Sequence, residues 1–236
     1  MSKKVKIAAT WDGKPITSSA VAWTINFVIS SETGDLMVLV DAPFFDDPAP
    51  PQGPGKYALT YEYEVVEVMV AAYPTGNGYN PYLELQIGPH GHYNIIFFLA
   101  EGDHAGADSG SDLDTRPSTK IDRETMRWSA EVAVPSFFLP EPVCGDDLSI
   151  AWMMNCYAMH GGAGSAGSVG SVKSAGKAGT HHGPREYLAH APVPGAVPNF
   201  HQLACFVPLV LYETLEQRMT VDRSVSGCVW GVFEGV

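Results

Sequence analysis

The chain has 236 residues and a formal net charge of −12, because 26 acidic residues outweigh 14 lysines and arginines. This charge opposes binding to nucleic acids and to anionic lipid surfaces, so DNA, RNA and membranes are not expected as partners. The length suits one domain with a large core, and we predict that residues 1–236 form a single domain.

The N-terminus also bears on where the protein resides. Residues 1–6 are basic, but no apolar run of signal-peptide length follows them. No later stretch approaches the roughly 18 apolar residues of a membrane-spanning helix. We therefore expect a cytoplasmic protein. The cysteines are too far apart for a zinc site or a disulfide framework, so we expect mostly buried, reduced thiols. They are Cys144, Cys156, Cys205 and Cys228.

Short strands with turns between them dominate the first hundred residues. Residues 5–10 suit a short edge strand, and residues 20–30 alternate apolar and polar side chains with a period of two. A polar turn then leads to the apolar run 36–40, which predicts a hairpin. The proline-rich segment 43–54 can be neither helix nor central strand, because proline lacks a backbone donor and fixes φ. We expect it to form a stiff loop.

Further strands are predicted on both sides of an acidic loop. Residues 61–70 place one carboxylate on each face, and the strands 82–87 and 93–99 form the middle of the sheet. We expect residues 101–122 to be a solvated loop and residues 135–140 a single helical turn. The remaining predicted strands are 126–134, 148–157 and 203–211.

Two segments carry little packing potential. Residues 161–183 are rich in glycine, serine and alanine and are predicted to be a flexible insertion. Residues 212–236 are expected to be a C-terminal extension, in which residues 213–219 suit a short helix. About nine strands without a long helix predict an all-β fold, an antiparallel β-sandwich of jelly-roll type with long loops.

Glu64 and Glu67 are the most informative polar residues, because a carboxylate inside a strand is costly unless it is paired. Arg185 is the natural partner, either in a structural ion pair or in a ligand site. Glu64 and Glu67 point to opposite faces, which excludes a glycosidase pair between them, whereas Glu64 and Glu84 remain compatible across strands.

Histidines and aromatic side chains offer other chemistry. His90-Gly91-His92 resembles a metal-ligand pair with Glu101 as a third ligand, but the acid lies too far along the chain for that kind of site. Aromatic rings near turns suit stacking on sugar faces, with carboxylates and arginine holding hydroxyl groups. These aromatic residues are Trp11, Tyr61, Tyr73, Tyr79, Tyr82 and Tyr187.

Several motifs together resemble an uncharacterised protein family found in animals and bacteria. The resemblance runs from about residue 10 to residue 206, and it implies a fold like that of type-9 carbohydrate-binding modules and DOMON-like sandwiches. The motifs are Thr10-Trp11-Asp12-Gly13, Ala42-Pro43-Phe44-Phe45, Tyr63-Glu64-Val65-Val66-Glu67, Tyr82-Leu83-Glu84, Pro89-His90-Gly91, Arg185-Glu186-Tyr187 and Pro198-Asn199-Phe200-His201.

These observations favour a non-catalytic binding module for a saccharide or a similar small polyhydroxyl ligand. Two alternatives stay open: an enzyme that uses His90 and His201 as acid and base or as metal ligands, and a cytosolic protein-interaction domain. We assign no catalytic or metal-binding residue and expect no cofactor. The predicted ligand-binding residues are Glu64, Glu67, Glu84, His90, Arg185, Tyr187 and His201.

Overall fold

The computed structural model describes residues 2–16, 22–73, 80–101, 116–144, 149–162 and 184–212, and within these ranges the fold is all-β. Short 3-10 turns, η2 (Thr60–Glu62), η3 (Ser136–Phe138) and η4 (Leu203–Cys205), interrupt the strands. The strands are β1 (Ser2–Ile7), β2 (Ala9–Thr10), β3 (Trp23–Ile29), β4 (Leu36–Pro43), β5 (Gly55–Lys56), β6 (Val65–Ala71), β7 (Tyr82–Ile87), β8 (His92–Phe98), β9 (Ser118–Asp122), β10 (Arg127–Val134), β11 (Val143–Cys144), β12 (Ser149–His160), β13 (Glu186–Ala189) and β14 (Val207–Tyr212).

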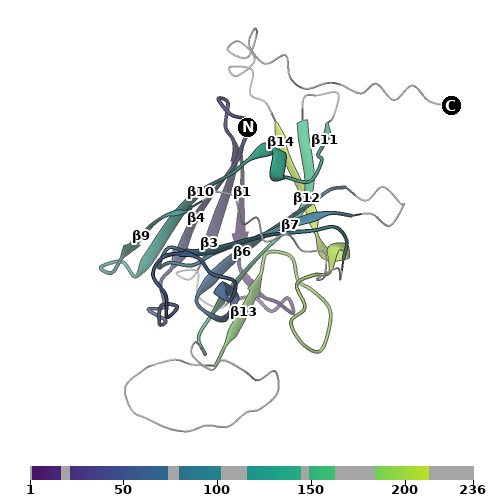
Figure 1. The fold of residues 1–236 in the computed structure, drawn as a ribbon. Coiled ribbons are helices and arrows are strands. Elements are labelled where there is room, and N and C mark those ends of the chain that lie inside the picture. The colour runs from purple at the N-terminus through teal and green to yellow at the C-terminus, as the bar shows by residue number, and fades with distance from the viewer. Residues whose placement is uncertain are drawn as a thin grey trace, which may run out of the picture.

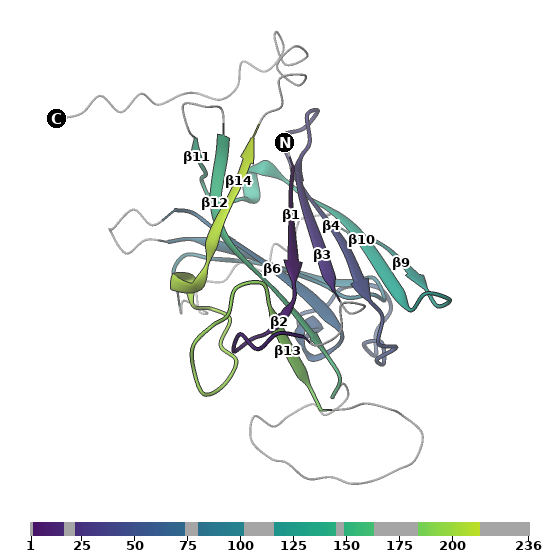
Figure 2. The same cartoon turned by 180° about the vertical axis from the view of Figure 1, so that it is seen from behind.

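The strands form two sheets. A five-stranded sheet has the order β1-β3-β4-β10-β9, and a nine-stranded sheet has the order β2-β13-β12-β6-β7-β8-β5, with β11 and β14 also paired to β12. Every pair is antiparallel except β5 with β8. Figure 1 shows the two sheets crossing, and in Figure 2 strands β1, β3, β4, β10 and β9 follow one another across the smaller sheet. The sandwich-like fold predicted from the sequence is confirmed.

The space between the sheets holds the main core. In β3, Trp23, Ile25 and Phe27 are buried and alternate with half-buried residues, as the period of two predicts. In β10 the same rule places Trp128, Ala130, Val132 and Val134 inward. Side chains from β6, β7 and β12 in the opposite sheet complete this core: Val66, Val68, Val70, Leu83, Leu85, Ile87, Trp152, Met154, Cys156 and Ala158.

A second apolar cluster covers the outer face of the nine-stranded sheet. Residues 190–206, which connect β13 to β14 and include η4, lie over this face; we call them the cover segment. Its Val193, Phe200 and Phe206 pack against side chains that rise from β6, β7 and β12. The nine-stranded sheet is therefore buried on both faces, which explains why β6 and β7 are buried at every position.

Four sequence predictions differ from the structure. Residues 61–64 are not strand: η2 occupies Thr60–Glu62 and β6 begins only at Val65. The predicted solvated loop contains the edge strand β9, in which the Ser118–Asp122 backbone pairs with β10. The predicted edge strand 5–10 is divided between β1 and β2, which belong to different sheets. Of the described cysteines, which are free thiols, Cys144 is exposed and only Cys156 is fully buried.

Several predictions concern residues outside the described ranges. They include most of the insertion 161–183, the C-terminal extension with its helix at 213–219, most of the acidic loop, Tyr79 and Cys228. The prediction of a single domain over residues 1–236 stays a prediction. Among the described residues, no helix has the length and apolar character needed to cross a membrane.

Candidate functional site

The outer face of the nine-stranded sheet carries an unusual set of buried polar side chains. Strand register places Glu67 of β6 opposite Gln86 of β7, and Gln86 opposite Asn94 of β8. Glu84 and His92 lie two residues from Gln86 and Asn94, so alternation along the strands puts them on the same face. Each of the five is at most 3% exposed. We call Glu67, Glu84, Gln86, His92 and Asn94 the outer polar patch.

Two carboxyl groups lie at the centre of this patch. The side-chain nitrogen Nε2 of Gln86 donates to Glu67 Oε1 at 3.2 Å and to Glu84 Oε1 at 2.5 Å. Burial raises the pKa of Glu84 to about 7. Burial and the neighbouring Glu84 carboxylate raise the pKa of Glu67 well above its usual range, while the Arg185 charge opposes this shift. The pair therefore holds protons at a pH where exposed carboxyls are ionised.

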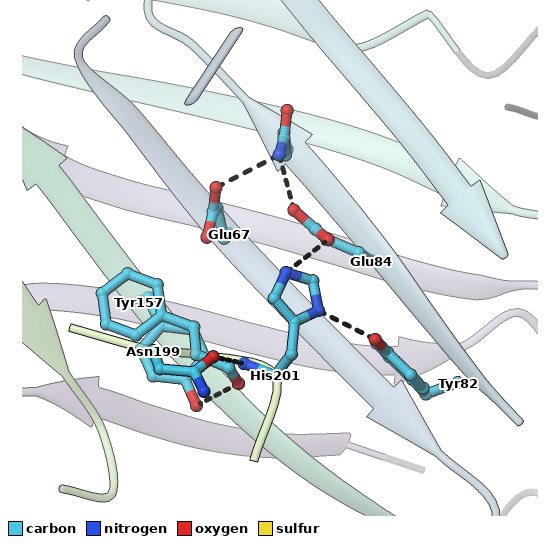
Figure 3. Close-up of polar contacts among 8 residues, drawn as sticks. Glu67, Tyr82, Glu84, Tyr157, Asn199 and His201 are labelled. Atoms are coloured by element: carbon cyan, nitrogen blue, oxygen red, sulfur yellow. Dashed lines mark hydrogen bonds and ion pairs between the residues drawn. The ribbon is translucent and has the colours of Figure 1, made fainter. Parts of the chain in front are cut away.

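His201 of the cover segment reaches down to this pair. Its Nδ1 lies 2.8 Å from the hydroxyl of Tyr82, and its Nε2 lies 3.8 Å from Glu84 Oε2. Figure 3 shows His201 between Glu84 and Tyr82 at the surface of the sheet, with Asn199 and Tyr157 beside it. The cover segment is held further by the Tyr157 hydroxyl, which donates to the carbonyl of Phe200 at 3.2 Å. The Tyr157 and Phe200 rings stack with their centroids 4.0 Å apart.

Three atoms of the outer polar patch are buried and have no hydrogen-bond partner among the described residues. They are Gln86 Oε1, Asn94 Oδ1 and His92 Nδ1. His92 Nε2 lies 2.9 Å from the carbonyl oxygen of Gln52, which can only accept, so Nε2 carries the hydrogen, and in that tautomer Nδ1 is an acceptor. All three are thus acceptors without donors, a costly arrangement in a buried site.

Arg185 and Tyr187 lie at one end of the same face. Arg185 donates to three backbone carbonyls: Gly161 at 3.0 Å, Tyr61 at 2.6 Å and Tyr63 at 2.7 Å. Among the described residues it forms no ion pair with a carboxylate, which differs from the predicted pairing with Glu64 or Glu67. Tyr187 meets the Phe200 ring edge-on, and the Arg185 guanidinium lies 6.0 Å from the Tyr187 ring.

Glu64 and His90 lie elsewhere, beside the proline-rich loop. Both carboxylate oxygens of Glu64 accept from the backbone nitrogen of Phe45 at 3.2 Å, and burial raises the Glu64 pKa to about 8. His90 Nε2 lies 3.1 Å from the carbonyl oxygen of Asp47. These contacts fix the loop to the start of β6 and to the turn before β8. The hollow that Glu64 and His90 line together is too narrow to admit a water molecule.

The structure therefore divides the predicted site. Glu67, Glu84 and His201 come together, with Arg185 and Tyr187 on the same face, whereas Glu64 and His90 contact the proline-rich loop. Of the two carboxylates that the sequence left open, Glu67 is the one that joins Glu84.

Sequence reasoning missed Gln86, Asn94 and His92 as parts of this cluster. Asn94 offered a signal, since an amide inside the otherwise apolar run 93–99 must be buried with its polar atoms. Gln86 offered another, because it follows Glu84 on the same strand face. The pairing between Glu67 and Glu84 depends on strand register, which the sequence alone did not supply.

The fold and the patch define an all-β, sandwich-like protein with a buried polar cluster on the outer face of its larger sheet. No protein-family model matches the chain. The chain is 29% identical over 227 residues to the UPF0462 protein C4orf33 homolog of Rattus norvegicus, a match that covers 93% of this chain and 94% of the rat protein.

Two further relatives have the same kind of name. The UPF0462 protein C4orf33 homolog of Danio rerio is 29% identical over 227 residues, with 92% of this chain and 94% of the fish protein covered. The human UPF0462 protein C4orf33 is 28% identical over 211 residues, with 85% and 84% covered. The chain is thus similar over most of its length to animal proteins of an uncharacterised family.

Proposed function

We propose that the chain belongs with the UPF0462 proteins and is a non-catalytic binding module for a saccharide or a similar small polyhydroxyl ligand, bound at the outer polar patch. The proposal keeps the expected kinship with type-9 carbohydrate-binding modules and DOMON-like sandwiches. Its support is local and chemical, because fold alone does not define a function.

The observation that carries the proposal is the group of unpartnered acceptors, Gln86 Oε1, Asn94 Oδ1 and His92 Nδ1. A buried acceptor without a donor costs about 1–3 kcal/mol of folding free energy. Three neighbouring ones together are a large cost beside the total stability of about 5–15 kcal/mol that is typical of a folded protein. A polyhydroxyl ligand supplies the missing groups, since each of its hydroxyls can donate one hydrogen bond. The cluster is then the polar part of a binding site.

Access to the patch requires movement of its covers. On the β6–β7 side the cover segment lies over Glu84 through His201. On the β8 side the end of the proline-rich loop lies over His92, where Gln52 accepts its hydrogen bond and the Tyr57 ring stands edge-on at 6.1 Å. The cover segment has little regular structure, and its Val197 is 68% exposed, so it is the part better suited to lift.

The test is binding of a panel of monosaccharides and short oligosaccharides, measured by calorimetry to millimolar sensitivity. The decisive variant is Asn94→Leu, which replaces a buried amide whose Oδ1 has no hydrogen-bond partner among the described residues by an apolar group of similar size. We expect this variant to lose binding while its thermal stability stays equal or rises, because an orphaned acceptor has been removed.

A matched control is Lys120→Ala, which alters an open hollow of about 250 Å³ beside β9 and β10 on the other sheet. This variant is expected to bind as the parent does. Saccharide binding that survives Asn94→Leu would place the ligand elsewhere, and a panel without any binder would refute the proposal.

A further inference from the structure

Within the described part of the chain, the two carboxyl groups of the outer polar patch have no cation within hydrogen-bond distance. Among the described residues, Glu67 and Glu84 accept hydrogen bonds only from the neutral amide of Gln86. Arg185 donates its hydrogen bonds to backbone carbonyls. The distance of 3.8 Å between His201 Nε2 and Glu84 Oε2 is longer than a hydrogen bond. Among the described residues, the two adjacent buried carboxyls therefore have no cation within hydrogen-bond distance, and the His201 ring and the Arg185 charge act on them only from farther away.

Acidic residues alone do not indicate a ligand, but the neighbouring orphaned acceptors do. Gln86 Oε1 belongs to the same amide whose nitrogen bridges the carboxyls, and Gln86 is 2% exposed. Asn94 lies directly across from Gln86 on β8, and its Oδ1 is unpartnered as well. The unpartnered atoms of the patch among the described residues are thus acceptors, beside a pair of groups able to carry negative charge.

We propose that the ligand of this patch is an amino-polyol, a small molecule that carries a protonated amine together with several hydroxyl groups. This inference rests on the proposed function and narrows its ligand class. The ammonium group is placed between Glu67 and Glu84, where it supplies donors and the missing positive charge. The ligand hydroxyls donate to Gln86 Oε1, Asn94 Oδ1 and His92 Nδ1.

Two further properties agree with this assignment. The net charge of −12 raises the local concentration of small cations and disfavours anionic ligands. Burial keeps the pKa of both carboxyls high, so the empty patch holds protons near neutral pH. A bound ammonium group favours the ionised carboxylates and expels those protons. Binding of an amine, but not of a neutral sugar, is then coupled to proton release.

The experiment compares three ligands that are built on the same sugar ring and differ in the group that carries, or lacks, the nitrogen. Calorimetry with the full chain at pH 6 uses glucosamine, glucose and N-acetylglucosamine, whose nitrogen carries no charge. Buffers of different ionisation enthalpy report proton release, and Tris is avoided because it is itself an amino-polyol. We expect glucosamine to bind at least about tenfold more tightly than the two neutral sugars, since charge-assisted hydrogen bonds are the stronger kind. Only glucosamine should release protons.

The variant Glu67→Gln/Glu84→Gln removes the charge and keeps the shape of the protonated pair. It is expected to bind glucosamine no more tightly than glucose while glucose affinity changes less than about twofold, within the scatter expected of a site that keeps its shape. Circular dichroism checks that the variant is folded, and the single variant Glu84→Gln provides a milder form of the same test.

Each outcome has a distinct meaning. Equal binding of glucosamine and glucose, or equal loss of both in the double variant, overturns the amino-polyol assignment and leaves saccharide binding intact. Methylammonium binding as tightly as glucosamine also overturns it, because hydroxyl groups would then contribute nothing. Absence of binding by all three sugars and by the wider panel instead removes the proposed function itself.

Discussion

The two faces of the nine-stranded sheet are equally buried but are specified by different physics. The inner face of β7 presents Leu83, Leu85 and Ile87 to the other sheet. Its outer face carries Tyr82, Glu84 and Gln86, and the first two contact His201 of the cover segment. The stability that the inner face contributes depends on buried apolar area and close packing, so a cavity there is destabilising. The outer face is held by hydrogen bonds between polar side chains, and some of its acceptors have no donor among the described residues. We infer that the first face holds the fold and the second serves its function.

The largest expected effect tests the inner face. Leu85→Ala removes a fully buried side chain between the sheets and should lower the free energy of unfolding by about 2–5 kcal/mol, as other large-to-small core substitutions do. Urea denaturation followed by tryptophan fluorescence measures the loss. The comparison is with Asn94→Leu on the outer face, which should not destabilise. A similar loss in both variants would erase the distinction between the faces.

The inner face was also the easier one to predict. Alternation in β3 and β10 depends only on a period of two and a covered face, so the burial of Trp23 and Trp128 agrees with the strand pattern alone. The outer face needed information that no local pattern contains. The meeting of Glu67 with Glu84 follows from register across two strands, and the burial of both follows from a loop more than a hundred residues away. Neither the neighbouring strand nor the covering loop is adjacent in sequence to the carboxyl group that it contacts.

Secondary-structure predictions from the local side-chain pattern were wrong where backbone hydrogen bonds determine the conformation. Residues 61–64 alternate as a strand does, but Thr60–Glu62 form η2, and the carbonyls of Tyr61 and Tyr63 accept hydrogen bonds from Arg185. β9 has the composition of a polar loop and still pairs with β10, because an edge strand with a solvated face needs little apolar content. Arg185 was expected to neutralise a carboxylate and instead donates to three backbone carbonyls, two of them in residues 61–63.

Part of the pH dependence of stability is expected to come from the outer face, beside the part that comes from Glu64, whose pKa burial raises to about 8. Folding raises the carboxyl pKa of Glu84 from 4.5 to about 7 and that of Glu67 well above 4.5. The folded state therefore binds these protons more tightly, so their contribution is fully present below about pH 4.5 and is lost as pH rises through the folded-state pKa.

The double variant Glu67→Gln/Glu84→Gln should flatten this dependence. Between pH 5 and pH 8 the parent is expected to lose about 1–3 kcal/mol more stability than the variant, since one pKa unit corresponds to about 1.4 kcal/mol. Urea denaturation at four pH values in this window measures the difference. Glu131→Gln, at an exposed position of β10, is the control and should keep the parental slope. Equal slopes in parent and double variant would contradict the expectation.

Arg185 holds Gly161 and residues 61–63 together, and its loss should have an intermediate effect on the free energy of unfolding. Arg185→Met leaves the carbonyls of Gly161, Tyr61 and Tyr63 without their donor, which should cost about 1–3 kcal/mol. Hydrogen exchange should also increase in η2 and at the start of β6. Arg123→Met, which breaks an exposed pair with Asp46, is the control and should stay within about 0.5 kcal/mol of the parent. A loss as small as that control's would show that the three carbonyls are solvated just as well by water.

The smallest expected effect tests how the cover segment is fastened. Tyr82→Phe removes the hydroxyl that lies 2.8 Å from His201 Nδ1 and leaves the stacked ring in place against Phe98. Because one hydrogen bond is lost, the free energy of unfolding should fall by only about 0.5–1.5 kcal/mol.

Local opening should respond more than global stability does, since this bond joins the cover segment to the sheet. Brief chymotrypsin treatment should cut the variant faster at Phe200 or Leu203, with the sites assigned by mass spectrometry. Tyr57→Phe, which alters a hydroxyl over β8, is the matched control and should leave this cleavage unchanged. If both variants are cut at the parental rate, the contact between His201 and Tyr82 does not fasten the cover segment, and the route to the outer polar patch must open elsewhere.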